Sequence, residues 1–210
     1  DDLSKYAFKA MTTWGDVEDF KHFLPRLLEL TAYYNNGYLV DDVIGFKLSY
    51  AACAQWPDAE RDALLGYVGA LWCCVIREHE PRMPVEELLC AAARARIDVL
   101  PCLDEWTAAC KQSDIAAYHL AYYIDTVVYI TELPTSPEAS SAESTKEASV
   151  DDESAAYRPI VAWLCASSTG DALEQALGAA DVRAGAGEAA LALDAAAAAR
   201  WRARHQGIGA

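Results

Sequence analysis

Apolar side chains recur every three or four positions along residues 1–133, which places them on one face of an α-helix. This spacing is clearest in Phe20, Phe23, Leu24 and Leu27. No segment alternates apolar and polar positions convincingly over the length of a β-strand. The pattern therefore predicts an all-α fold.

Capping residues and prolines predict where the helices begin. Asp16 is suited to an N-cap because its carboxylate accepts N–H groups of the first helical turn, and Asp98 and Ser113 are suited in the same way. Pro57 favours the first turn of another helix, since it has no N–H to lose there. The expected helices follow one another in pairs: 23–34 with 41–55, 58–79 with 84–97, and 99–110 with 113–132.

Two segments of this region share a pattern. Residues 22–31 (HFLPRLLELT) and 98–107 (DVLPCLDEWT) carry Leu-Pro, Leu, Glu and Thr at the same offsets. Halfway between them, residues 62–65 (DALL) lie in the helix expected after Pro57. Such spacing predicts a unit of two antiparallel helices that repeats as an α-solenoid. A chance match between short segments is the alternative interpretation.

The Leu-Pro-x-Leu opening, the polar turn and the capped second helix resemble HEAT-type repeats over residues 20–133. The resemblance implies a short curved stack whose second helices line a concave face, and it brings no catalytic residues. Residues 6–30 (YAFKAMTTWGDVEDFKHFLPRLLEL) also resemble a family of uncharacterised bacterial proteins with no assigned activity. That second resemblance implies a bacterial protein but adds nothing about function.

Three zones of different composition predict the domain organisation. Residues 1–133 are expected to form the helical-repeat domain. Residues 134–153 are rich in Ser, Glu and Ala with little to bury, which predicts an acidic flexible linker or loop. Residues 154–210 are Ala-rich and predict a helical C-terminal segment that packs on the repeat domain as a cap. An acidic docking tail is the alternative function for the middle zone.

The net charge and the hydropathy of the chain argue against two classes of partner, nucleic acids and membranes. The chain has 32 acidic and 17 basic residues, a formal net charge of −15. A phosphate backbone would be repelled by this charge, so we do not expect nucleic-acid binding. No apolar run approaches the roughly 18 residues that a membrane span requires, so we expect a soluble protein.

The seven cysteines lie mostly in apolar helical stretches, where a free thiol behaves as a small hydrophobic side chain. A secreted disulfide scaffold would be shorter and richer in loops, so we expect reduced thiols and a cytoplasmic protein. No cofactor is expected. The chain begins at Asp1 rather than Met, which leaves open whether an upstream segment is missing.

Tyrosines mark the expected binding surface. Segment 114–130 combines several of them with a histidine and an aspartate, and tyrosine gives a large contact area together with a hydroxyl. The candidate binding residues are Tyr50, Tyr118, His119, Tyr122 and Asp125. In the solenoid they would share the concave, acidic face. We therefore expect a non-enzymatic module or adaptor that binds another protein, with packing of the same tyrosines in the core as the alternative.

An enzyme or a metal-dependent module is the alternative function, centred on His22, on His119 or on the region from Cys73 to Cys90. Cys73, His79 and Cys90 are the candidate zinc ligands. Cys74 follows Cys73 directly, and adjacent residues on a helix point about 100° apart, so at most one of these two cysteines would join the site. No familiar catalytic motif is present, and we assign no catalytic residue. A subunit of a homo-oligomer is a further possibility, since poorly capped solenoids stack.

Overall fold

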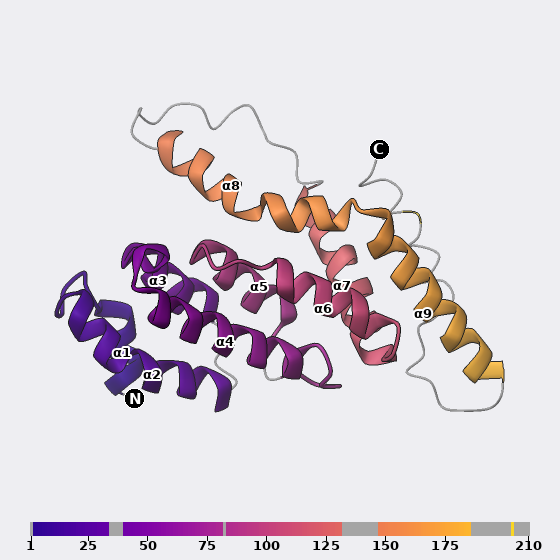
Figure 1. The fold of residues 1–210 in the computed structure, drawn as a ribbon, viewed down its shortest axis with the longest axis horizontal. Coiled ribbons are helices and arrows are strands. Elements are labelled where there is room, and N and C mark those ends of the chain that lie inside the picture. Colours follow the sequence, from indigo (N-terminus) through magenta and orange to yellow (C-terminus); the bar gives the residue numbers. More distant parts are fainter. Residues whose placement is uncertain (1, 34–39, 82, 132–146, 186–202, 204–210) are drawn as a thin grey trace. The chain divides into compact units, whose positions relative to one another are not determined.

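A computed structural model describes residues 2–33, 40–81, 83–131, 147–185 and 203 of the chain (Figure 1). Helices make up the regular structure of these residues, and they contain no strand beyond one isolated bridge between Ala10 and Trp14. The expected all-α class is confirmed for this part of the chain. None of its helices is both long and apolar enough to cross a membrane.

The chain divides into two compact units, residues 1–102 and 103–210, with the boundary inside helix α6. The elements up to that boundary are α1 (Asp2–Lys9), α2 (Val17–Tyr33), the π-helical η2 (Val40–Gly45), α3 (Phe46–Tyr50), the 3₁₀ turn η3 (Cys53–Gln55), α4 (Asp58–Val75), α5 (Val85–Arg94) and α6 (Leu100–Cys110). The elements after it are α7 (Asp114–Thr131), α8 (Glu147–Leu164) and α9 (Ser167–Gly185). Of the expected linker, residues 134–146 lie outside the described residues and residues 147–153 form the first turns of α8.

The expected N-caps are present. The Asp16 carboxylate accepts the N–H groups of Glu18 at 3.0 Å and Asp19 at 3.1 Å, and the Asp19 carboxylate accepts the Asp16 N–H at 3.1 Å. These bonds satisfy donors that the first turn of α2 would otherwise leave unpaired. Asp98 likewise accepts the N–H of Leu100 at 3.0 Å before α6.

Helix α5 ends three residues before the expected residue 97, at Arg94. The N–H of Ile97 donates to the Ala92 carbonyl and the N–H of Arg96 to the Ala93 carbonyl, both at 3.0 Å. This pair of hydrogen bonds closes a helix when the residue after the C-cap has a left-handed backbone conformation. Arg96 has that conformation, with a φ of 60°. Glycine is usual at this position. Because Arg96 occupies it instead, the sequence contains no signal for the end of α5.

The core of residues 1–102 forms where η2 and α5 come together. Gly45 permits this approach, because a Cβ atom there would lie 2.8 Å from the Cα of Ala91. Val43 and Ile44 of η2 and Leu48 of α3 are buried in the same cluster as Leu27 of α2.

A buried lysine joins α3 to the turn after α1. The Lys47 side chain is 3% exposed, and its Nζ donates to the Ala10 carbonyl at 2.6 Å and to the Thr12 hydroxyl at 3.4 Å. The carbonyl lies just beyond the C-terminus of α1, where the helix dipole favours a cation. Burial lowers the pKa of Lys47, because the charged form loses its hydration.

In residues 103–210 the core is built around two tryptophans. Trp106 is fully buried, stacks on Trp163 with ring centroids 5.4 Å apart, and donates its indole N–H to the Ala116 carbonyl at 2.9 Å. The Trp163 indole N–H donates to the Thr107 hydroxyl at 2.9 Å. These contacts join α6 to α7 and α8 around one aromatic cluster.

Candidate functional site

A groove of about 640 Å³ runs between α2 and α4 and opens to solvent. We call it the α2–α4 groove. Its lining residues are Lys21, Leu24, Pro25, Leu28, Glu29, Ala32, Tyr33, Trp56, Glu60, Ala63, Leu64 and Tyr67. Most of these side chains are apolar, and the charged ones lie at positions 21, 29 and 60.

Helical periodicity explains which residues line the groove. On α2 they fall at positions 21, 24–25, 28–29 and 32–33, and on α4 at 60, 63–64 and 67, one helical face in each case. Leu24, Leu64 and Trp56 are buried at the base, whereas Tyr33 is 71% exposed. The groove is therefore the part of the apolar faces of α2 and α4 that is open to solvent.

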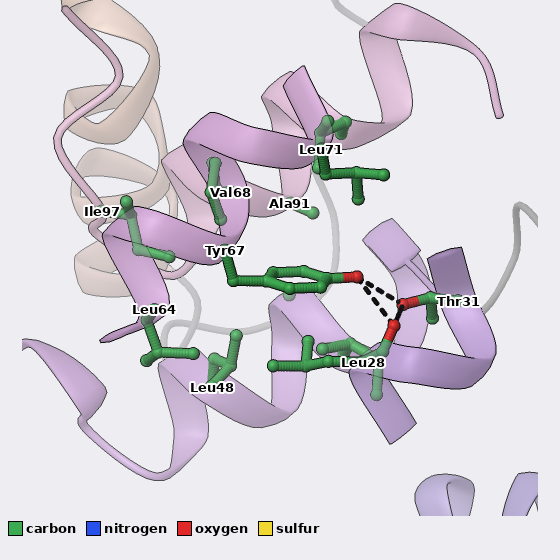
Figure 2. Close-up of a pocket in the computed structure, with 13 residues that line it drawn as sticks. Leu28, Thr31, Leu48, Leu64, Tyr67, Val68, Leu71, Ala91 and Ile97 are labelled. Atoms are coloured by element: carbon green, nitrogen blue, oxygen red, sulfur yellow. Dashed lines mark hydrogen bonds between the residues drawn. The ribbon is translucent and has the colours of Figure 1, made fainter. Parts of the chain in front are cut away.

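Tyr67 holds the base of the groove in place. Its hydroxyl donates to the Leu28 carbonyl at 2.8 Å and lies 3.0 Å from the Thr31 hydroxyl, which itself donates to Leu28 at 2.7 Å (Figure 2). Burial raises the pKa of Tyr67, and the hydrogen bond to Thr31 partly offsets this. The ring is thus fixed between α4 and α2.

Figure 2 shows Tyr67 beside a second, smaller cavity, which Val68, Ala91 and Ile97 also line. The cavity volume is about 30 Å³. It is too small for a ligand, whose sites usually measure about 300–1,000 Å³. Tyr67 therefore lines both this small cavity and the α2–α4 groove.

The groove's one basic lining residue is already bound by carboxylates. Lys21 Nζ lies 2.9 Å from Glu60 Oε2 and 3.4 Å from Glu18 Oε1, and 4.7 Å from the centre of the Trp56 ring. The hydrogen bond to Glu60 raises the pKa of Lys21, so the ammonium stays charged at neutral pH. At the other end of the groove Glu29 pairs with Arg26 at 2.6 Å.

The tyrosines expected to bind a partner lie in both units. On α7, Tyr118 and Tyr122 are 39% and 50% exposed and occur four residues apart, on one face; we call this pair the tyrosine face. His119 beside them is buried, with 7% exposed. Tyr50 ends α3 in the other unit and is 57% exposed. The side chain of Asp125 lies outside the described residues.

The candidate metal ligands do not form a cluster. Cys73 on α4 and His79 after it are exposed, and Cys90 on α5 is half-buried. Within the described part of the chain, no three His, Cys, Asp or Glu side chains are arranged to hold a metal ion. His22, the alternative catalytic centre, is exposed on α2. Its ring packs edge to face with the ring of Phe23, and the two ring centroids are 5.0 Å apart.

Known proteins supply no further guide. No family model, curated protein or solved structure matches this chain. The features of the molecule that bear on function are therefore the geometry of the groove and the exposed tyrosines.

Sequence analysis did not identify the groove. Its residues belong to ordinary amphipathic helices, and periodicity does not say which part of an apolar face a neighbour covers. One available signal was the width of the apolar face of α2, which includes Leu24, Leu27 and Leu28 and continues to Tyr33. The ion pair between Lys21 and Glu60 joins distant segments and has no local signal.

Proposed function

We propose that this protein is a non-enzymatic module that binds another protein, built as a short HEAT-like stack of antiparallel helix pairs. The α2–α4 groove is the observation that carries the proposal. It is an open, largely apolar surface with a base held by Tyr67 and a charged rim. Apolar surface of this kind, rimmed by polar residues, marks interaction sites in soluble proteins.

The volume of the groove, about 640 Å³, lies within the range of small-molecule sites, but its length and its distribution of charge favour a protein segment. From Lys21 to Tyr33 it follows α2 for about 18 Å, at a rise of about 1.5 Å per residue. The base is apolar and the charges lie towards the two ends, an arrangement that matches the apolar centre and polar rim of protein interfaces. A base already fixed by hydrogen bonds reduces the entropy lost on binding.

A charge placed in the groove is expected to prevent capture of the partner. Ala63 is exposed on the rim, so Ala63→Arg leaves the fold intact while filling the groove with a guanidinium. Ala108→Arg, at an exposed position on α6, is the matched control. The immobilised full chain should recover a partner from the cells that express it, and the partner, once purified, should bind Ala63→Arg at least about tenfold more weakly. Equal binding to both variants would contradict the proposal.

The tyrosine face is a second proposed contact surface, and the same assay examines it. Because Tyr118 and Tyr122 are exposed, replacing both by alanine should change the unfolding free energy little and should weaken partner binding. Loss of folding would mean that these tyrosines are core residues. Unchanged binding would remove the tyrosine face from the proposal and leave the groove.

A further inference from the structure

The walls of the α2–α4 groove fit a third helix. Two helices that present neighbouring ridges leave a channel into which the side chains of another helix can pack. The groove follows α2 over about 18 Å, which is the length of about three helical turns. An occupant with apolar residues at positions i, i+3 or i+4, and i+7 would place them over Leu28, Leu64 and Tyr67.

The charges of the groove disfavour an acidic occupant. Lys21 is the basic residue of the lining, and its ammonium already contacts Glu60, Glu18 and the face of Trp56. The carboxylates of Glu60 and Glu29 lie towards opposite ends of the groove, where Glu60 already pairs with Lys21 and Glu29 with Arg26. Together with Glu18, the acidic groups still outnumber the basic ones, and the whole chain carries a net charge of −15. This excess of negative charge favours a basic occupant, which the long-range field also steers.

Building on the proposed function, we infer that the α2–α4 groove binds an amphipathic α-helix of about three turns from a partner protein, with Lys or Arg residues flanking its apolar stripe. The apolar stripe packs on Leu28, Leu64 and Tyr67. The basic residues contact Glu29 and Glu60. The same lining disfavours an acidic helix and gives an extended peptide no sheet edge on which to form a strand.

Defined peptides test this inference. A labelled peptide of about 14 residues, with a leucine stripe flanked by lysines, is titrated with the purified full chain and followed by fluorescence anisotropy. One comparison peptide has glutamate in place of lysine, and another has two central prolines that prevent a helix. We expect the basic helix to bind at least about tenfold more tightly than either comparison peptide.

Variants of the protein assign the binding to the groove. Ala63→Arg should weaken binding of the basic peptide at least about tenfold, whereas Ala108→Arg, with the same net charge, should not. Glu29→Gln should weaken binding of the basic peptide and leave binding of a neutral peptide unchanged. Equal binding to Ala63→Arg and Ala108→Arg, or tighter binding of the acidic peptide, would overturn the inference.

Two further outcomes separate the inference from the proposed function. If no peptide binds but capture of the cellular partner still depends on Ala63, the helical, basic class of occupant is wrong and the protein-binding function stands. If light scattering shows a dimer that Ala63→Arg dissociates, the occupant is a second copy of this chain, which also overturns the inference.

Discussion

The free energy of unfolding is expected to fall steeply as the pH rises above 9, because three buried thiols stay protonated in the folded chain. Burial raises the pKa of Cys53 and Cys102 from 9.0 to about 11 and that of Cys110 to about 12. Nearby charges of Cys73 and Asp98 add to the effect at Cys102.

The sign follows from the protons bound in each state. Above pH 9 the unfolded chain loses these thiol protons while the folded chain keeps them, so the folded state loses relative stability as the pH rises through the folded pKa values. Each buried thiol contributes a slope of at most about 1.4 kcal/mol per pH unit, so the three thiols together contribute at most about 4 kcal/mol per unit between pH 9 and 11. Tyr67, whose pKa is also raised, acts in the same direction, and Lys47, whose pKa is lowered, acts in the opposite one.

Urea unfolding between pH 8 and 10.5, in the presence of a reductant, measures this slope. Cys110→Ala and Cys53→Ala should each make it shallower, even though each loses some packing energy at neutral pH. Cys74→Ala removes an exposed thiol and should keep the slope of the unsubstituted chain. A urea midpoint that stays constant across this pH range would contradict the burial of the three thiols.

The replacement of Gly45 by alanine is expected to destabilise residues 1–102 by about 3 kcal/mol, because the added methyl group overpacks the core. Its carbon would lie 2.8 Å from the Cα of Ala91 and 3.1 Å from the Ala91 carbonyl oxygen. These are backbone atoms of α5, so the strain is relieved only if η2 and α5 move apart. For the same reason Ala91→Gly should not rescue the variant.

Gly66 provides the matched control. A Cβ atom at Gly66, within α4, meets no atom within 4 Å. Gly66→Ala should therefore raise the unfolding free energy by up to about 1 kcal/mol, the difference in helix propensity between the two residues. Urea unfolding of both variants gives the comparison. If Gly45→Ala proves as stable as Gly66→Ala, the close contact between η2 and α5 does not exist in solution.

Local signals explain which parts of the fold could be predicted. The caps at Asp16 and Asp98 act on N–H groups two or three residues away, so the sequence contains both partners of each bond. The end of α5 was missed because Arg96 adopts a left-handed conformation that the sequence does not announce. Lys47 was missed because its acceptor, the Ala10 carbonyl, lies far away along the chain.

The candidate site was hard to predict for the same reason. Side-chain contacts join α4 to α2, although η2, α3 and η3 separate these helices in the sequence. Among them are the hydrogen bond between Tyr67 and Thr31 and the ion pair between Lys21 and Glu60. Tyr118 and Tyr122 were candidates because they occur together on one helical segment, but the sequence left open whether they are exposed or packed in the core; both are exposed. Periodicity did not distinguish them from His119, which is buried.

Photo-crosslinking in the intact chain tests most directly whether the α2–α4 groove binds a protein. A photoreactive phenylalanine at Ala63 faces the groove, and one at Leu65, two residues further on α4, points away from it. We predict one discrete adduct with another protein from position 63, none from position 65, and loss of the adduct when Ala32→Arg is added. The absence of an adduct from position 63, or equal adducts from both positions, would contradict a protein-binding groove.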